Sequence, residues 1–363
     1  MIERRELERY LGRVLGAPVE LLALRPLKGA IAEGDDPKAY GYGMPFEIEC
    51  LVDGEPRKFV LSRARPERGF GRDYPADRAW SALWAHGAYN VFPRHVTSHD
   101  VGFRRRSGEM VSAGDAVEFF QLVEKAEGQP YWLDLDRLRT EPAAARDLAR
   151  VDALARFLAG VHAKRLDAPW LYHRRIRELV GHGECLMGIL DSYPHPDPLL
   201  PAETCVALEQ SAVAWRWRLR SFAHRLASVH GDFHPWNVLF REGTDFSLLD
   251  RSRGEWGEPA DDVAALTINY LFFGLLRGPG LAAPFQRLFD RFFETYLDAS
   301  RDRELLQVLP PFFMFRALVL AHPLWYPTVP ATARLALLRF ARAMGELLPF
   351  DPGAVGRTLT GGL

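Results

Sequence analysis

One segment of the chain, residues 230–237, constrains its fold and chemistry more than any other. It reads His-Gly-Asp-Phe-His-Pro-Trp-Asn, so Asp232 and Asn237 lie five residues apart after a His-Gly pair. Thirteen residues after Asn237, the apolar run 246–249 ends in Asp250. Phosphoryl transfer needs one carboxylate that positions a hydroxyl and accepts its proton, and oxygen ligands that hold Mg²⁺ against nucleotide phosphates. The spacing therefore predicts a catalytic loop followed by a strand that ends in a metal ligand.

A plainer interpretation of the same segment is a turn whose side chains satisfy nearby backbone groups. Asparagine is scarce in this chain and occurs only at Asn90, Asn237 and Asn269. One of the three falls where a metal ligand is wanted, directly downstream of the His-Gly-Asp sequence. The combination favours the catalytic loop over the turn.

The segment resembles the aminoglycoside phosphotransferase and choline kinase superfamily, which is distantly related to the protein kinases. The matching positions are His230, Gly231, Asp232, His234 and Asn237. The resemblance implies an α+β, two-lobed, protein-kinase-like fold with a small antiparallel β-sheet in the N-terminal lobe and a large, mostly helical C-terminal lobe. We expect residues 1–125 to form the nucleotide-binding lobe and its hinge, and residues 126–363 to carry the catalytic loop, metal site and substrate pocket.

Each polar residue of the motif has an expected role. Asp232 is the expected general base, since a positioned carboxylate can orient an alcohol and take its proton. Asn237 and Asp250 are the expected Mg²⁺ ligands, because Mg²⁺ prefers oxygen donors. ATP or GTP would be the phosphate donor. We expect His230 and His234 to support the loop rather than react.

A second motif, residues 257–264, reads Gly-Glu-Pro-Ala-Asp-Asp-Val-Ala. Proline suits the first turn of a helix, and carboxylates there oppose the helix dipole, so the segment predicts a helix start. The resemblance implies that Asp262 braces the catalytic loop through backbone hydrogen bonds.

The nucleotide side departs from the family pattern. Relatives usually have Val-Leu-Lys or Val-Leu-Arg, whereas residues 60–63 read Val-Leu-Ser-Arg. Lys58 and Arg63 lie on opposite faces of the predicted strand, and either could reach the phosphates. The paired carboxylate is Asp77, or else the matching position is Ala79 and the pair is missing.

Residues 117–123 are mostly apolar and predict a strand, which runs into the polar bend 124–128. In the kinase-like families a strand and bend of this kind form the hinge between the lobes. The resemblance implies that Val123, Glu124 and Ala126 contact the nucleotide there.

Asp250 is followed by Arg251-Ser252-Arg253 rather than Phe-Gly. Both arginines could be solvated, or their guanidinium groups could lie near the transferring phosphate or an anionic substrate. Trp236 and Trp256 flank the catalytic segment and could bind a quaternary ammonium group or a flat apolar compound. Most aromatic rings in the chain should be core.

The acceptor is expected to be a small molecule with a hydroxyl group. From residue 263 onward there are seven Asp and Glu against ten Arg, which is not the acidic wall that a polycationic aminoglycoside would need. A nucleotide-binding pseudokinase or scaffold is the rival hypothesis, and an enzyme of the same fold that transfers AMP is a third.

Composition limits the partners and the location. A formal net charge of −1 with dispersed charges argues against a nucleic-acid surface and a polybasic membrane anchor. The three cysteines lack the spacing of a disulfide framework or zinc site. Residues 1–6 lack a signal-peptide core, and the apolar run 263–276 is too short to span a membrane. We expect a cytoplasmic protein without membrane partners; the oligomeric state stays open.

Periodicity predicts the remaining elements. We expect helices at 2–16, 77–87 and 148–161. His162 follows the last of these, and we expect it to be a hydrogen-bonded histidine in the core. The other expectations are strands within 21–27, 46–52 and 58–61, a glycine-bearing segment with Gly29, Gly34, Gly41 and Gly43, a proline-rich loop at 191–201, helices over 263–348 and a frayed end at 351–363.

Overall fold

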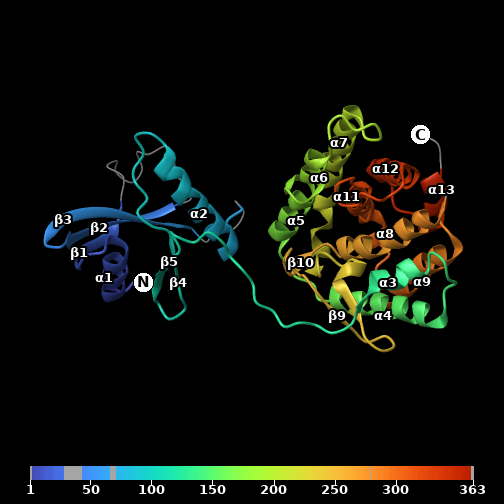
Figure 1. The fold of residues 1–363 in the computed structure, drawn as a ribbon, viewed down its shortest axis with the longest axis horizontal. Helices are drawn as coiled ribbons and strands as arrows, with labels where there is room; N and C mark the ends of the chain where they lie inside the picture. The colour runs from blue at the N-terminus through green and yellow to red at the C-terminus, as the bar shows by residue number, and fades with distance from the viewer. Residues whose placement is uncertain (1, 28–42, 66–70, 279, 361–363) are drawn as a thin grey trace. The chain divides into compact units, whose positions relative to one another are not determined.

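The chain divides into two compact units, Met1–Val123 and Glu124–Leu363 (Figure 1). The computed structural model describes residues 2–27, 43–65, 71–278 and 280–360. Of the predicted glycine-bearing segment, Gly29, Gly34 and Gly41 lie outside the described residues.

Unit 1 is built on a three-stranded antiparallel sheet in the order β1-β2-β3. The strands are β1 (Val19–Pro26), β2 (Gly43–Val52) and β3 (Glu55–Ala64). Helix α1 (Arg4–Leu15) packs on one face, because Leu7 and Leu11 recur at the helical spacing and are buried with Ile48 and Cys50 of β2. The opposite face carries charged side chains.

The rest of unit 1 consists of helix α2 (Pro75–Val91) and a second small sheet of β4 (Gly102–Arg104) and β5 (Met110–Ser112). Helix α2 is longer than the predicted helix at both ends. A proline in its first turn suits the start of a helix, where the backbone N–H has no helical partner.

The prediction of a strand at 117–123 is wrong. Residues 116–127 have no regular secondary structure, and the side chain of Phe120 is 92% exposed. An apolar run becomes a strand only when a second strand satisfies its backbone groups. No described strand pairs with residues 117–123.

Unit 2 is mostly helical, and its buried centre is α8 (Pro259–Arg277), which contacts α9, α11 and α12. The predictions of a buried helix at 263–276 and of helices over 263–348 are confirmed. The other helices are α3 (Tyr131–Arg137), α4 (Ala145–His162), α5 (Pro169–Gly181), α6 (Leu186–Ser192), α7 (Ala202–Leu219), α9 (Ala283–Ser300), α10 (Leu305–Val308), α11 (Pro310–Ala321), α12 (Ala331–Gly345) and α13 (Val355–Thr360), with 3-10 turns η1 (Arg220–Arg225), η2 (Pro235–Asn237) and η3 (Pro352–Ala354).

Five short strands complete unit 2 and surround the predicted catalytic loop. They are β6 (Gln129–Pro130), β7 (Ala227–Ser228), β8 (Val238–Phe240), β9 (Phe246–Leu248) and β10 (Trp256–Gly257). Strand β8 pairs with both β6 and β9, and β7 pairs with β10. The loop therefore begins at β7 and ends at β8, with a small sheet at each end.

The C-terminal segment is more ordered than expected. Residues 352–360 form η3 and α13 rather than a frayed end, because Val355 and Leu359 lie four positions apart and are both buried. The proline-rich loop predicted at 191–201 is confirmed for residues 193–201, which have no helix or strand, whereas residues 191 and 192 end α6.

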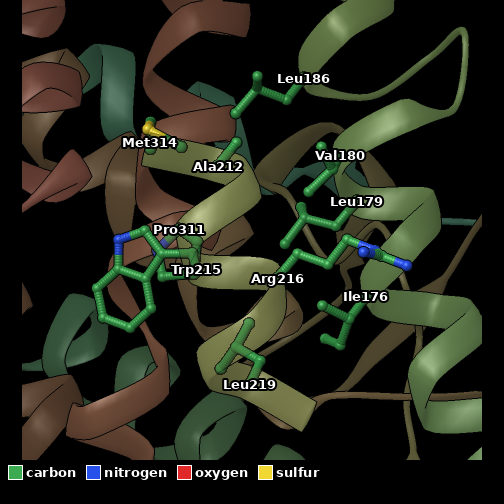
Figure 2. A pocket seen from close by; sticks show the side chains of 10 residues that line it. All are labelled: Ile176, Leu179, Val180, Leu186, Ala212, Trp215, Arg216, Leu219, Pro311 and Met314. Carbon is green, nitrogen blue, oxygen red and sulfur yellow. The ribbon is translucent and has the colours of Figure 1, made fainter. Parts of the chain in front are cut away.

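One pocket in unit 2 lies between α5, α6, α7 and α11 (Figure 2). Apart from Arg216 its lining is apolar, with Trp215 and Met314 among the larger side chains, and it has no space as large as a water molecule. It is a packing seam that contains none of the predicted site residues.

These observations confirm the predicted α+β class, with a small antiparallel sheet in the N-terminal unit and a mostly helical C-terminal unit. Within the described ranges, every helix is too short or too polar to cross a lipid bilayer.

Candidate active site

The predicted catalytic loop is a backbone turn held between two small sheets. Its entry is fixed where the Val229 N–H donates to the Glu255 carbonyl at 3.1 Å. Gly231 then takes a φ of 88°, in the left-handed region that favours glycine. A Cβ at this position would also lie 3.2 Å from Cβ of Arg253. Both the conformation and the space therefore call for glycine at this turn.

Asp262, in the first turn of α8, is completely buried and accepts hydrogen bonds from the loop backbone. Its two oxygens accept the N–H groups of His230 and Gly231, each at 2.7 Å. His162 Nε2 lies 3.1 Å from Asp262 Oδ2. Burial alone would raise the pKa of Asp262, but its hydrogen bond with His162 lowers it below the ordinary value. An ionised carboxylate thus holds the turn that precedes Asp232.

His162 is the buried histidine expected on the face of α4. Its Nδ1 lies 2.7 Å from the Tyr296 hydroxyl, and its Nε2 faces Asp262, so both ring nitrogens have partners. The ring links α4, α8 and α9 beneath the loop.

Asp232 has a nitrogen partner at each carboxylate oxygen. Arg316 Nη1 donates to Oδ1 at 2.5 Å, and His234 Nε2 lies 3.5 Å from Oδ2. His234 Nδ1 accepts the Trp236 N–H at 3.2 Å, and its Nε2 also lies 3.3 Å from Asn237 Nδ2. Burial by itself would raise the pKa of Asp232, but the charge of Arg316 outweighs it and holds the pKa well below its ordinary value. Asp232 is thereby kept as a carboxylate.

Asn237 and Asp250 are connected through the backbone. The Asn237 side-chain amide donates to the Asp232 carbonyl at 3.1 Å, and the Leu249 N–H donates to the Asn237 carbonyl at 2.9 Å. Asp250 follows Leu249 and has a φ of 50°, a conformation that Asp tolerates better than most residues. The end of β9 is therefore tied to the loop that carries Asp232.

The donor set suits a hard divalent cation. Asn237 Nδ2 is directed to the Asp232 carbonyl, and within the described residues its Oδ1 accepts no hydrogen bond. Asp250 is exposed, and no described residue bonds to its carboxylate. An amide oxygen and a carboxylate are ligands that Mg²⁺ accepts beside phosphate oxygens. No cluster of three or more His, Cys, Asp or Glu occurs in the part of the chain that the structure describes.

His230 is buried and packs its ring edge-on against Phe233. Its Nδ1 accepts the Asp232 N–H at 3.3 Å, which fixes the backbone of that residue. Its Nε2 is buried without a hydrogen-bond partner in the described structure. These contacts are within the loop itself.

The two arginines after Asp250 have different surroundings. Arg251 donates from Nη2 and Nε to the Val229 carbonyl at 2.7 and 2.9 Å, so its guanidinium supports the loop entry. Arg253 lies over the Phe315 ring at 5.7 Å, and its charge helps to lower the pKa of Asp232. Among the described residues, Arg253 has no hydrogen bond or ion pair. Of the two, Arg253 is the one available to an anion.

A sequence model of the phosphotransferase enzyme family matches residues 50–307. The chain belongs to this family. No curated protein gives a significant match. Phosphotransferase activity is what the family and the predicted motif have in common.

Several solved structures resemble this phosphotransferase. An amicoumacin kinase in complex with AMP-PNP and Ca²⁺ is 15% identical, covers 91% of each chain and has a TM-score of 0.42. A Plasmodium vivax ethanolamine kinase is 13% identical over 94% of this chain and 81% of its own, with a TM-score of 0.34. The choline kinase of Streptococcus pneumoniae is 12% identical over 98% of this chain and 95% of its own, with a TM-score of 0.31. Since each TM-score is below 0.5, the family assignment depends on the family model alone.

The two tryptophans that flank the loop of this phosphotransferase have different surroundings. Trp236 stacks on Trp132 with ring centroids 6.2 Å apart and meets Tyr326 edge-on at 6.2 Å. The pKa of Tyr326 is raised to about 12 by burial and by the charge of Asp232. Trp256 lies instead under Lys164, whose Nζ is 5.2 Å from the ring.

The nucleotide-side candidates lie in unit 1 and the segment after it. Lys58 is on the exposed face of β3, where its Nζ is 2.6 Å from Glu49 Oε1. The Arg63 guanidinium lies 5.5 Å from the centre of the Phe46 ring. Asp77 Oδ2 accepts the Tyr74 N–H at 2.8 Å at the start of α2.

Val123 and Glu124 are exposed and Ala126 is half-buried in the irregular segment 116–127. Their expected contact with a nucleotide stays a prediction.

Sequence reasoning missed Arg316, which contacts the loop, and Asp261, which binds Arg316. Arg316 is buried in α11, and Asp261 stands beside Asp262 in α8; Arg316 Nη2 donates to Asp261 Oδ1 at 2.7 Å. A signal was present, because Arg316 is the only charge in the apolar run 308–321. A charge in a buried helix must be paired, but the sequence does not say with what.

Proposed function

We propose that this phosphotransferase moves the γ-phosphate of ATP, or GTP, to a hydroxyl group of a small molecule. Asp232 is the base in this proposal, and Asn237 and Asp250 are the ligands of Mg²⁺. His230, His234 and Asp262 hold the loop in place.

One observation carries the proposal: hydrogen bonds connect the segment of the base to the segments of both metal ligands. The Asn237 amide bonds to the backbone of Asp232, and the residue before Asp250 bonds to the backbone of Asn237. Phosphoryl transfer depends on positioning and electrostatics more than on covalent chemistry by the protein. A linked base and metal site supplies that positioning.

The chemistry proposed for Asp232 is a single proton transfer. Its carboxylate orients the acceptor O–H and takes the proton as the new O–P bond forms and the bond from the γ-phosphorus to the bridging oxygen breaks, which releases ADP or GDP. The carboxylate must be ionised to accept the proton, and the neighbouring Arg316 and His234 favour that state. Bound Mg²⁺ would neutralise charge on the phosphates.

The test is ADP release from Mg·ATP in the presence of a panel of hydroxyl compounds, including sugars, amino alcohols and antibiotics. Wild-type protein should release ADP with at least one acceptor, and the Asp232→Asn variant should not. The product should gain the mass of one phosphate. Absence of turnover with every acceptor, or equal rates for both proteins, would remove the proposal.

A second candidate is a protein that binds nucleotide without turnover. It is favoured by the contacts in unit 1, where Lys58 is held by Glu49 and Asp77 caps its own helix. Thermal shift with ATP, with and without Mg²⁺, separates the candidates when it is combined with the turnover assay. A third, AMP transfer, would add the mass of AMP to an acceptor.

A further inference from the structure

Arg316 is a buried guanidinium that joins the carboxylates of Asp232 and Asp261. It is 6% exposed in α11, where its neighbours from Phe312 to Phe315 are all buried apolar side chains. Taking a charge out of water is costly unless that charge is paired and hydrogen-bonded. The pairing partners of Arg316 therefore explain its presence in an apolar helix, and one of them is the proposed base.

The guanidinium contacts both the side chain and the backbone of the loop. Nη1 donates to Asp232 Oδ1 at 2.5 Å, and Nη2 donates to the Gly231 carbonyl at 3.1 Å. Because a guanidinium is planar and rigid, these two bonds fix the Asp232 carboxylate relative to the turn that precedes it. The other carboxylate oxygen of Asp232, Oδ2, lies 3.5 Å from His234 Nε2. No other basic side chain among the described residues lies within 4.0 Å of Oδ2.

Asp261 holds the guanidinium from the opposite side. Its Oδ1 accepts from Nη2 at 2.7 Å and lies 3.3 Å from Nε, while Asp232 takes Nη1. The two carboxylates thus bind different edges of the same guanidinium group. Asp261 adjoins Asp262, so α8 carries one carboxylate that braces the loop backbone and another that anchors Arg316.

We propose that Arg316 is a positioning residue for the reaction: it holds Asp232 Oδ1 so that Oδ2 is presented to the acceptor hydroxyl, and Asp261 keeps Arg316 in place. This inference rests on the proposed function, because it assigns a role within the same reaction. Arg316 acts through Asp232. Its removal should therefore lower kcat and leave nucleotide binding nearly unchanged.

A purely structural ion pair is the alternative, and Arg150 offers a matched control for it. Arg150 is 7% exposed, and it also combines carboxylate and backbone partners: it binds the carboxylate of Asp134 and the carbonyls of Gly243 at 2.9 Å and Arg241 at 3.1 Å. None of these partners belongs to the catalytic loop. An Arg150→Met variant loses the same kinds of contact without touching Asp232.

The experiment compares wild type, Arg316→Met, Arg316→Lys, Arg150→Met and the double variant Arg316→Met/Asp261→Asn. For each, kcat and KM for Mg·ATP are measured by ADP release with an acceptor that wild type uses. The affinity for Mg·AMP-PNP is measured by calorimetry, and the folded fraction by thermal unfolding. The double variant removes one positive and one negative charge, so Asp261 is not left as an unpaired carboxylate, and this variant carries the test if Arg316→Met alone does not fold.

We expect Arg316→Met to lower kcat per folded molecule roughly 10- to 100-fold, the scale of a misplaced catalytic group. KM for Mg·ATP and the dissociation constant of Mg·AMP-PNP should stay within about twofold of wild type. Arg316→Lys should recover part of kcat, because an ammonium group can still donate to Asp232 but cannot hold both carboxylates as a fork does. Arg150→Met should lower the melting temperature and leave kcat per folded molecule unchanged.

Three outcomes would overturn the inference while wild type is active: wild-type kcat in Arg316→Met, recovery of kcat in the double variant, or an equal loss of kcat in Arg150→Met. Recovery in the double variant would mean that the unpaired charge of Asp261 had caused the loss. If wild type itself shows no turnover with any acceptor, the proposed function fails and this inference falls with it.

Discussion

The proposed catalytic loop of unit 2 and the charged sheet face of unit 1 hold their candidate functional residues in opposite ways. Asp232 is paired with a buried arginine, and the backbone before it is bound by a carboxylate with no exposed surface. The side chain of Lys58 is 66% exposed, and it contacts Glu49 and Glu47 on the neighbouring strand. Exposed ion pairs contribute little and exchange partners easily, whereas buried networks fix a geometry.

The difference teaches which part of the proposed site is preorganised. The base and its supports are fixed by the packing of unit 2 alone. The cations of unit 1 are held by local contacts that a triphosphate could replace. Substitutions in the buried network around Asp232 should therefore change kcat or stability, and substitutions on the sheet face should change nucleotide affinity alone.

The largest effect is expected for Asp232→Asn. An amide cannot accept the acceptor's proton, so kcat should fall about 10²–10⁴-fold. The fold should survive, because Arg316 keeps Asp261 and the Gly231 carbonyl as partners. ADP release measures the rate, and thermal unfolding is the control. A variant that keeps wild-type kcat would show that Asp232 is not the base.

Asp262→Asn should weaken the loop itself. It removes the charge from a fully buried carboxylate that accepts two backbone N–H groups and faces His162. A hydrogen bond to a charged group is worth about 1.5–3 kcal/mol, so the loss of the charge should lower the free energy of unfolding by an amount that denaturant unfolding would detect. Asp298→Asn, on the exposed surface of α9, is the matched control and should leave the midpoint unchanged. Equal effects of both would contradict the brace.

Acid should weaken the buried ion pairs of unit 2 selectively. The side chain of Asp302 is 10% exposed and binds Arg225 at 2.7 Å. Burial would raise the pKa of Asp302, but its hydrogen bond with Arg225 lowers it. The pKa of Asp302 is therefore lower in the folded protein than in the unfolded chain. The hydrogen bond then stabilises the fold by about 1.5–3 kcal/mol above about pH 4, and this stabilisation is lost as the pH falls through the pKa of the folded state.

The measurement for Asp302 is the free energy of unfolding of wild type and Asp302→Asn at pH 7 and at low pH. The difference should shrink on acidification. In unit 1 the Glu49→Gln substitution is the exposed counterpart, and it should give no measurable difference at either pH. If the difference in free energy of unfolding between wild type and Asp302→Asn grows in acid, the predicted direction of the pH dependence is wrong.

Asp250→Asn should weaken nucleotide binding in a Mg²⁺-dependent way, by on the order of tenfold, as loss of a charged ligand weakens a metal site. Calorimetric titration with AMP-PNP, with and without Mg²⁺, measures this. Asp245→Asn is the control, since Asp245 is exposed and pairs with Arg241 in the same hairpin. If Asp250→Asn and wild type bind Mg·AMP-PNP equally, Asp250 is not a ligand.

The smallest effects are expected for Lys58→Met and Arg63→Met, and they decide between the two cations. Only one variant should raise the KM for Mg·ATP, by roughly threefold to tenfold, as loss of a partly screened charge contact does. Neither should change kcat or the melting temperature. A loss of kcat for either variant would break the contrast drawn between the two units.

Features that depend only on neighbouring residues in the chain were predictable from the sequence. The spacing of Asp232, Asn237 and Asp250 is a local property, and so are the helix start at Pro259 and the buried helix after it. The strand expected at 117–123 failed for the opposite reason, since a strand depends on a partner strand that the run itself does not specify.

Contacts between distant segments were not predictable. Arg316 lies 84 positions after Asp232, and no local pattern connects the two. Arg251 and Arg253 look equivalent in sequence, yet Arg251 supports the loop entry, whereas Arg253 has no hydrogen bond or ion pair among the described residues. Their difference comes from which backbone carbonyls pack nearby.

By itself, the sequence determined the types of group at the site and their order, because a motif requires side chains of definite chemistry at fixed spacing. Only the tertiary structure decided which of those groups are buried, charged and oriented, because the pairing of Asp232 with Arg316 and of Asp262 with the loop backbone arises when α8 and α11 pack beneath the turn. Burial makes such pairs obligatory, and packing chooses the partners.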